Sequence, residues 1–81
     1  MDEEEIFRKI QETIVDQLAV DPEEVHSDAY FLQDLGADSF YMVEFAEAIE
    51  DLFGIRIPEG DLESIETVGD AVRYIKNRLE E

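Results

Sequence analysis

Three stretches of the chain repeat hydrophobic residues at the spacing of an α-helix. Residues 3–18 carry apolar residues at every third or fourth position, with charged residues between them. Residues 39–53 have a broader apolar stripe. Residues 68–79 have a narrower one, and a capping-box sequence that starts at Thr67 marks the beginning of this stretch. The pattern predicts three longer helices. The stripe of the second helix consists of Val43, Phe45, Ala46, Ala48, Ile49, Leu52 and Phe53.

The segments between these stretches have a weaker pattern. Residues 19–38 have no periodicity, but their apolar residues predict an ordered loop that packs on the core. Pro22 opens a turn, residues 55–58 read as extended, and residues 58–65 read as a short helix. We therefore expect an all-α fold, a small four-helix bundle with three longer helices and one short one. The long ordered loop joins the first two helices, and residues 1–81 form a single domain.

The net charge of −17 on 81 residues is the strongest feature of the composition. Nucleic acid and anionic membranes would repel such a chain, whereas basic protein surfaces would attract it. The chain has no cysteine, which excludes disulfides, thiolate metal sites and a cysteine nucleophile. Its N-terminus is acidic, no apolar run is long enough to span a membrane, and no stretch fits a calcium-binding loop. We expect a cytoplasmic monomer that binds no nucleic acid, membrane or metal.

Ser39 begins the second predicted helix, directly after Asp38. A helix N-terminus favours a phosphate group, so the Ser39 hydroxyl is suited to covalent attachment of a phosphorylated group. The alternative is that Ser39 or Asp38 simply caps the helix, and the local residues leave both interpretations open. A catalytic serine is not favoured, because His26 is the only histidine and no oxyanion loop accompanies it. We expect no enzyme activity.

Acidic residues gather on one side of the second helix. At about 100° per residue, Glu44, Glu47 and Asp51 align along one face, and Glu50 lies at its edge. No lysine or arginine of this helix relieves their mutual repulsion. We interpret the face as a docking surface for basic patches on other proteins. A merely solvated face is the alternative.

Two aromatic residues, Phe40 and Tyr41, occupy the first turn of the same helix. We expect both to be exposed beside the acidic face and to contact partner proteins. The alternative is that either ring folds back onto the preceding loop.

Several motifs, in this order and with these separations, resemble those of acyl carrier proteins. They are Leu35-Gly36-Ala37-Asp38-Ser39, Val43-Glu44, Glu50-Asp51, Phe53-Gly54-Ile55-x-Ile57-Pro58 and Thr67-Val68-Gly69-Asp70-Ala71-x-x-Tyr74-Ile75. The resemblance extends over essentially the whole chain. It implies a four-helix bundle to which a phosphopantetheinyl transferase attaches 4′-phosphopantetheine from coenzyme A, at Ser39. The thiol of that group would carry acyl groups as thioesters.

The resemblance also implies roles for residues around Ser39. Asp38 matches the acid that precedes the modified serine and takes part in recognition by the transferase. Recognition acids of the second helix are matched by Glu44, Glu50 and Asp51. Secondary contact positions near the third helix are matched by Ile57, Glu59 and Glu63.

Some positions depart from the family pattern. Phe40 replaces a usual leucine, Tyr41 replaces a common acid, and Glu47 replaces an apolar contact residue. Met42 replaces a smaller residue, and Phe45 replaces a leucine that typically lines the acyl cavity. We expect these two side chains to reduce the cavity volume, which predicts a preference for short or unusual acyl groups, or poor sequestration of long ones. The alternative is that the helices shift outward and the cavity is unchanged.

The resemblance predicts a carrier of acyl intermediates for fatty-acid or related synthesis, whose partners have basic docking patches. A specialised polyketide carrier is an alternative. A peptidyl carrier is less favoured, because such carriers usually have a non-acidic residue where this chain has Asp38. From a different class, the chain could be a non-catalytic acidic interaction subunit with a carrier-like fold.

Overall fold

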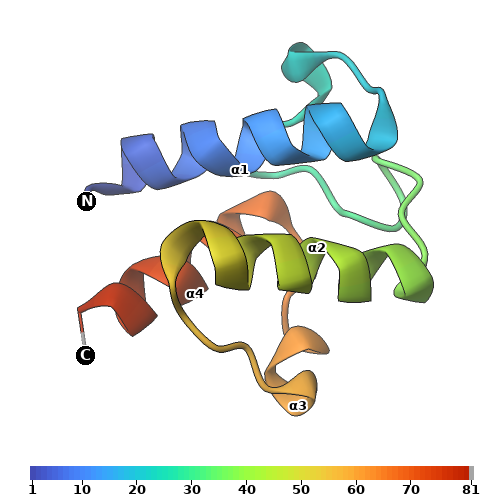
Figure 1. Cartoon of the computed structure of the whole chain (residues 1–81). Coiled ribbons are helices and arrows are strands. Elements are labelled where there is room, and N and C mark those ends of the chain that lie inside the picture. The colour runs from blue at the N-terminus through green and yellow to red at the C-terminus, as the bar shows by residue number, and fades with distance from the viewer. Residues whose placement is uncertain (81) are drawn as a thin grey trace.

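The computed structural model describes residues 1–80, which form an all-helical bundle (Figure 1). Its elements are α1 (Glu3–Leu18), the 3₁₀ turn η1 (Pro22–Glu24), α2 (Ser39–Phe53), α3 (Glu59–Leu62) and α4 (Val68–Leu79). This arrangement confirms the prediction of three longer helices and one short one. α1 and α2 run antiparallel, α4 packs against α1, and α3 stands to one side of the three longer helices.

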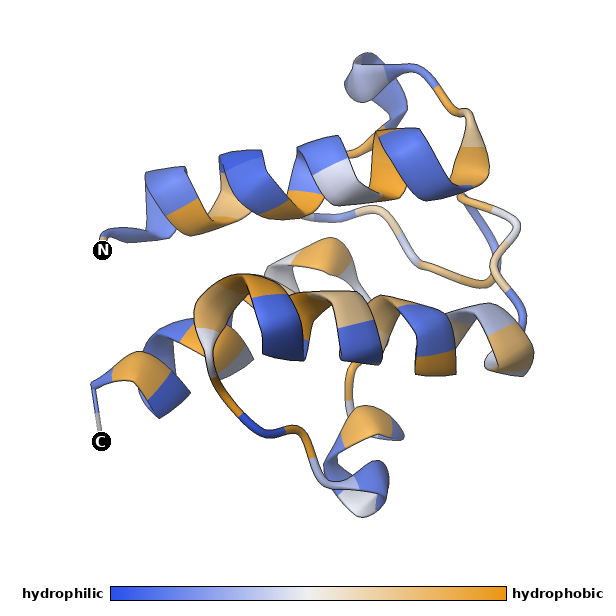
Figure 2. Ribbon diagram, viewed as in Figure 1, coloured by the Kyte–Doolittle hydropathy of each residue, from blue (hydrophilic) through white to orange (hydrophobic). Residues whose placement is uncertain are grey.

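The apolar faces of the longer helices meet in one core. Ile6, Ile10 and Ile14 of α1 are completely buried. Figure 2 shows this pattern, since the hydrophobic positions of α1 lie on the side that faces α2. Phe31 of the loop and Phe45 of α2 pack together with ring centroids 5.1 Å apart. α4 contributes Val68, Ala71, Val72 and Ile75.

The long loop between α1 and α2 is ordered, as predicted, because backbone hydrogen bonds fasten it to the start of α4. These bonds run from Phe31 N–H to Glu66, from Val68 N–H to Ala29, and from Gly69 N–H to Ser27. The last of them is 2.9 Å long, and a Cβ atom at Gly69 would lie only 2.9 Å from the Ser27 carbonyl oxygen. A glycine at this position therefore lets the loop approach α4 closely.

The buried stripe of α2 is narrower than the sequence predicts. Val43 and Leu52 were both expected in it, but they are 50% and 47% exposed. Val43 comes two residues before Phe45, about 200° around the helix, and so lies on the side away from the buried stripe. Leu52 follows Ile49, the last buried residue of the helix. The expectation of burial is therefore wrong for these two side chains.

α3 is also shorter than the predicted range of 58–65. It ends at Leu62, and the following residues form turns that bury Ile65. Ser64 explains the early end, because its N–H and its hydroxyl both donate to the Asp61 carbonyl, at 3.1 and 2.7 Å. A serine that bonds to nearby backbone in this way competes with continuation of the helix.

Candidate functional site

Ser39 is the first residue of α2, and it is exposed. The cap of the helix is Asp38, whose carboxylate accepts the N–H of Tyr41 at 2.7 Å. Gly36, with φ of 71°, turns the chain toward this point in a backbone region that favours glycine. Within residues 1–80, the Ser39 hydroxyl makes no hydrogen bond. Capping therefore belongs to Asp38, and the Ser39 hydroxyl is available for covalent chemistry.

A cleft with a volume of about 490 Å³ opens beside Ser39. Its lining comes from the loop before α2, from α2, and from α3 with the turn that follows it. The residues are Tyr30, Phe31, Leu32, Gln33, Ser39, Met42, Val43, Glu59, Leu62, Glu63, Ile65 and Glu66. Small-molecule sites have volumes of about 300–1,000 Å³ and a mostly apolar lining. The exposed hydroxyl thus lies next to a cleft that suits an apolar ligand.

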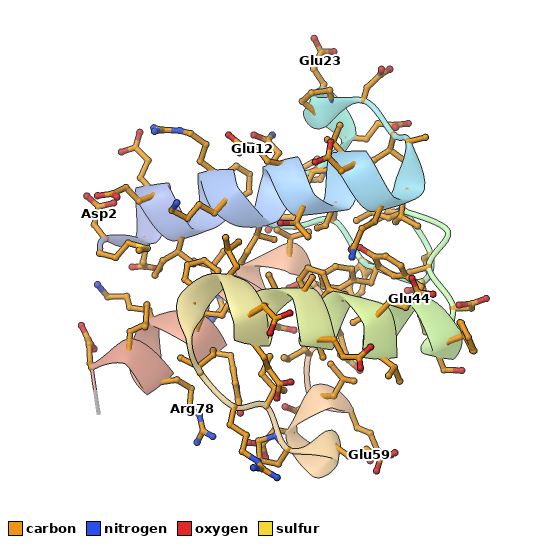
Figure 3. All side chains as sticks on the ribbon, in the orientation of Figure 1. Asp2, Glu12, Glu23, Glu44, Glu59 and Arg78 are labelled. Atoms are coloured by element: carbon orange, nitrogen blue, oxygen red, sulfur yellow. The ribbon has the colours of Figure 1, made fainter. Side chains whose placement is uncertain are left out.

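The acidic face of α2 consists of Glu44, Glu47 and Asp51, all of which are exposed. The ion pairs of the described chain involve other acids, namely Asp70 with Arg73 and Glu80 with Lys76. The acids of α2 therefore have no cationic partner within residues 1–80, and their charges are available to another molecule. Figure 3 labels Glu44 on this helix and Glu59 on α3. Glu59 is also exposed and adds to the negative charge near the cleft.

The two aromatic residues of the first turn of α2 differ in their exposure to solvent. Phe40 is 75% exposed, as expected. The expectation that Tyr41 is an exposed partner contact is wrong, because it is buried. Its hydroxyl donates to Gln17 Oε1 of α1 at 2.8 Å, and its ring centroid lies 6.1 Å from that of Phe45. Burial, and secondly the charge of Glu44, raise the pKa of the Tyr41 phenol far above its ordinary value, so it stays neutral.

Glu50 and Ile57, two further predicted docking residues, are bonded to each other. The Ile57 N–H donates to a Glu50 carboxylate oxygen at 2.7 Å, which fixes the loop between α2 and α3. Glu50 is half-buried, and the Ile57 side chain belongs to the core. This burial contradicts a direct docking role for the Ile57 side chain. Glu63, like Glu59, is exposed and lines the cleft.

Three exposed apolar residues at the cleft, Tyr30, Leu32 and Val43, escape prediction as site residues from the sequence. The sequence pattern assigns all three to the core. The loop offers no regular period that would reveal this exposure, because residues 31–35 form a hydrogen-bonded turn rather than a strand or a helix. Phe31 is buried, and Tyr30 and Leu32 on either side of it are exposed.

The two large side chains of α2 that were expected to crowd the cavity lie in different places. Met42 lines the cleft, as that expectation requires. Phe45 lies outside the cleft lining and is instead buried against Phe31 and Tyr41. The expectation that Phe45 reduces the cavity volume is therefore wrong, because its ring fills the core between α2 and the loop.

Within residues 1–80, no group of three or more histidine, aspartate or glutamate side chains is arranged to hold a metal ion. None of the helices in this part of the chain combines the length and the apolar character that crossing a membrane requires.

Comparison with known proteins identifies the family. The protein-family model for the phosphopantetheine attachment site matches residues 8–75. The chain is also 52% identical over 71 residues to an acyl carrier protein from Wolinella succinogenes, a match that covers 88% of this chain and 93% of the relative. The chain belongs to the acyl carrier protein family.

Other acyl carrier proteins give the same result. The chain is 49% identical over 77 residues to one from Lactobacillus acidophilus, covering 95% of this chain and 96% of the relative. It is 47% identical over 72 residues to one from a Sulfurovum species, covering 89% and 96%. A solved structure of an acyl carrier protein from Enterococcus faecalis superposes with a TM-score of 0.81 at 37% identity, covering 96% of this chain and 99% of that one.

Membership of this family establishes what the chain does. It is a carrier rather than a catalyst, and it bears covalently attached 4′-phosphopantetheine on which acyl intermediates travel. It interacts with a phosphopantetheinyl transferase and with enzymes that handle acyl groups.

Proposed function

We propose that Ser39 Oγ holds the phosphopantetheine of this acyl carrier through a phosphodiester bond, and that the attached acyl chain enters the adjoining cleft. The observation that supports this proposal is an exposed hydroxyl without a hydrogen-bond partner, at the start of α2 and on the lining of the cleft.

The residues around Ser39 fit the group. Ser39 lies at the positive end of the α2 dipole, which favours the charge of a phosphate. Asp38 holds the first turn through its bond to the Tyr41 N–H, so attachment does not have to replace a cap. The bound arm supplies a thiol for thioesters, which this cysteine-free chain lacks. Apolar side chains such as Leu62 and Met42 shield an acyl chain from water, at about 0.8 kcal/mol for each buried methylene.

We infer that partner enzymes dock on the exposed residues that surround Ser39. Phe40 offers an apolar contact in the first turn, and the acidic face of α2 offers charge to basic patches. Complementary charge steers such encounters and fixes their orientation more than it adds affinity. The proposed docking residues are Asp38, Phe40, Glu44, Glu47, Asp51, Glu59 and Glu63, with Glu50 at the edge.

We propose fatty-acid or closely related synthesis as the pathway, with the carrier working as a cytoplasmic monomer and as one domain. The charge of −17 disfavours self-association. A specialised polyketide carrier is the second candidate, because Glu47 presents a charge on the docking face. Mass spectrometry of the acyl group on the protein from its native cells would separate these pathways.

The attachment site is tested by incubating the protein with a phosphopantetheinyl transferase, Mg²⁺ and coenzyme A, and measuring the intact mass. We expect one added phosphopantetheine in the native chain and none in Ser39→Ala. Ser27→Ala is the matched control, since Ser27 is also exposed and its side chain makes no hydrogen bond within residues 1–80. Modification of Ser39→Ala, or no modification of the native chain by any transferase, would refute the proposal. The second outcome would favour an acidic interaction subunit.

A further inference from the structure

Side chains, rather than backbone hydrogen bonds, hold the α3 segment (residues 55–65) in place. Within the described chain, the backbone bonds of residues 58–65 stay inside that range, such as Leu62 N–H to the Pro58 carbonyl. The loop of residues 19–38, by contrast, is bonded through its backbone to the start of α4. The position of α3 therefore depends on side-chain contacts, which include the packing of Ile57, Leu62 and Ile65 on the core.

α4 provides two of these contacts. The Tyr74 hydroxyl donates to Asp61 Oδ2 at 2.7 Å, and both residues are half-buried. Arg78 Nη2 donates to the Arg56 carbonyl, also at 2.7 Å, and its guanidinium lies 5.5 Å from the centre of the Tyr74 ring. Figure 3 shows Arg78 on α4, directed toward the segment that leads into α3. α4 thus holds the α3 segment at two points.

The same segment forms one wall of the cleft. Glu59, Leu62 and Glu63 line the cleft from α3 and its end, and Ser39 and Met42 line it from α2. Tyr74 and Asp61 are absent from the lining. They support that wall from outside the cleft, so they can set its position without touching a ligand.

We propose that the Tyr74–Asp61 hydrogen bond is a latch that fixes α3 and thereby limits the length of acyl chain that the cleft accepts. This inference rests on the proposed function, because it takes the cleft as the acyl site. Tyr74 and Asp61 act as positioning residues. Loss of the bond lets α3 move away from α2, and the cleft then accepts longer chains.

The first experiment uses the unmodified protein, so it does not depend on attachment at Ser39. Hydrogen exchange is compared for the native chain, Tyr74→Phe and Tyr41→Phe. The control loses a similar tyrosine bond, to Gln17, away from the cleft. In Tyr74→Phe we expect the amides of Asp61, Leu62 and Ser64 to exchange about five- to tenfold faster. We expect no such local change in Tyr41→Phe.

If the amides of Ile10 and Ile14 in α1 exchanged faster by the same factor in Tyr74→Phe, the whole protein would be destabilised, and the latch proposal would be overturned. Unchanged exchange in α3 would overturn it as well. Asp61→Asn retains an oxygen that accepts the tyrosine hydroxyl, so it should keep slow exchange, whereas Asp61→Ala should exchange as fast as Tyr74→Phe.

In the second experiment, phosphopantetheine arms that carry butyryl, octanoyl or dodecanoyl groups are attached to the protein. The rise in Tm over the unacylated form is then measured. We expect the rise to level off at a shorter chain in the native carrier than in Tyr74→Phe. If no arm raises Tm in the native carrier, the proposed acyl site fails. If the native carrier responds but Tyr74→Phe shows the same dependence on chain length, only the latch fails.

Discussion

The two sides of this molecule are stabilised in different ways. One side, which we name the frame, consists of α1, α4 and residues 25–31 of the loop. Aliphatic side chains and backbone hydrogen bonds hold it together. The other side, which we name the carrier face, consists of the outer surface of α2 together with α3. It exposes phenylalanine, valine, leucine and carboxylates, and side-chain bonds fix its shape.

This difference separates stability from function. The frame keeps few exposed apolar residues and has the ion pairs of the described chain at α4. The carrier face combines unrelieved negative charge, an unpartnered hydroxyl and an open cleft, none of which favours folding. Changes in the frame should therefore alter stability, and changes on the carrier face should alter recognition.

The largest effect on stability should come from Gly69→Ala in the frame. The new Cβ would lie 2.9 Å from the Ser27 carbonyl oxygen, so the loop must move and strain the hydrogen bond that joins the two residues. We expect a loss of about 1–3 kcal/mol in the free energy of unfolding, measured with urea. Gly60→Ala on α3 is the control, because a Cβ there meets no atom within 4 Å. It should leave stability unchanged or raise it slightly. Equal losses in the free energy of unfolding of both variants would contradict the claim that the frame, and not the carrier face, determines stability.

The next effect should appear on the carrier face. Glu44→Lys combined with Glu47→Lys should slow modification by a basic phosphopantetheinyl transferase on the order of tenfold, and should weaken the salt dependence of the rate. The free energy of unfolding should not fall, because the change relieves repulsion along α2. Glu12→Lys on the exposed outer side of α1 is the control and should leave the rate nearly unchanged. Similar slowing in this control would mean that total charge, rather than the face, controls docking.

The smallest effect should be the contribution of Asp70 to acid stability. Burial opposes ionisation of its carboxyl, but the N–H groups of Thr67 and Glu66 and the Arg73 guanidinium outweigh it and lower the pKa below the ordinary 3.8. The unfolded chain therefore takes up the proton first. Stability from this group is complete above about pH 3.8 and is lost as pH falls through the lower, folded pKa.

Urea unfolding of the native chain and of Asp70→Asn, as a function of pH, measures this contribution. The gap between the two free energies should narrow as the solution becomes more acidic. A gap that stays constant down to the most acidic point would contradict the assignment, since the variant lacks the titrating carboxyl.

The sequence predicts the frame well, because its signals are local. Isoleucine spacing defines α1, and the Thr67–Asp70 capping box marks the start of α4, where both reciprocal bonds are present. The carrier face is predicted less well, because its details depend on contacts between distant segments. The hydroxyl of Tyr41 reaches Gln17 of α1, and Glu50 bonds the backbone of Ile57. Neither contact has a signature at the spacing of a helix.

The cleft could not be predicted from the sequence as a shape, although Ser39 could be predicted as a candidate attachment point. Its walls come from three segments separated along the chain, and Leu32 and Val43 read as core residues until their neighbours are in place. The choice between Asp38 and Ser39 as the cap also needed geometry, because both residue types are common at that position.

The division of labour at the start of α2 affects how the carrier is reused from one cycle to the next. The Asp38 carboxylate caps the helix, and the proposed attachment point is the next residue. Forming or hydrolysing a phosphodiester at Ser39 would therefore remove no hydrogen bond from the helical backbone. An enzyme that binds the protein before the group is attached and one that binds it afterwards would thus contact the same first turn of α2.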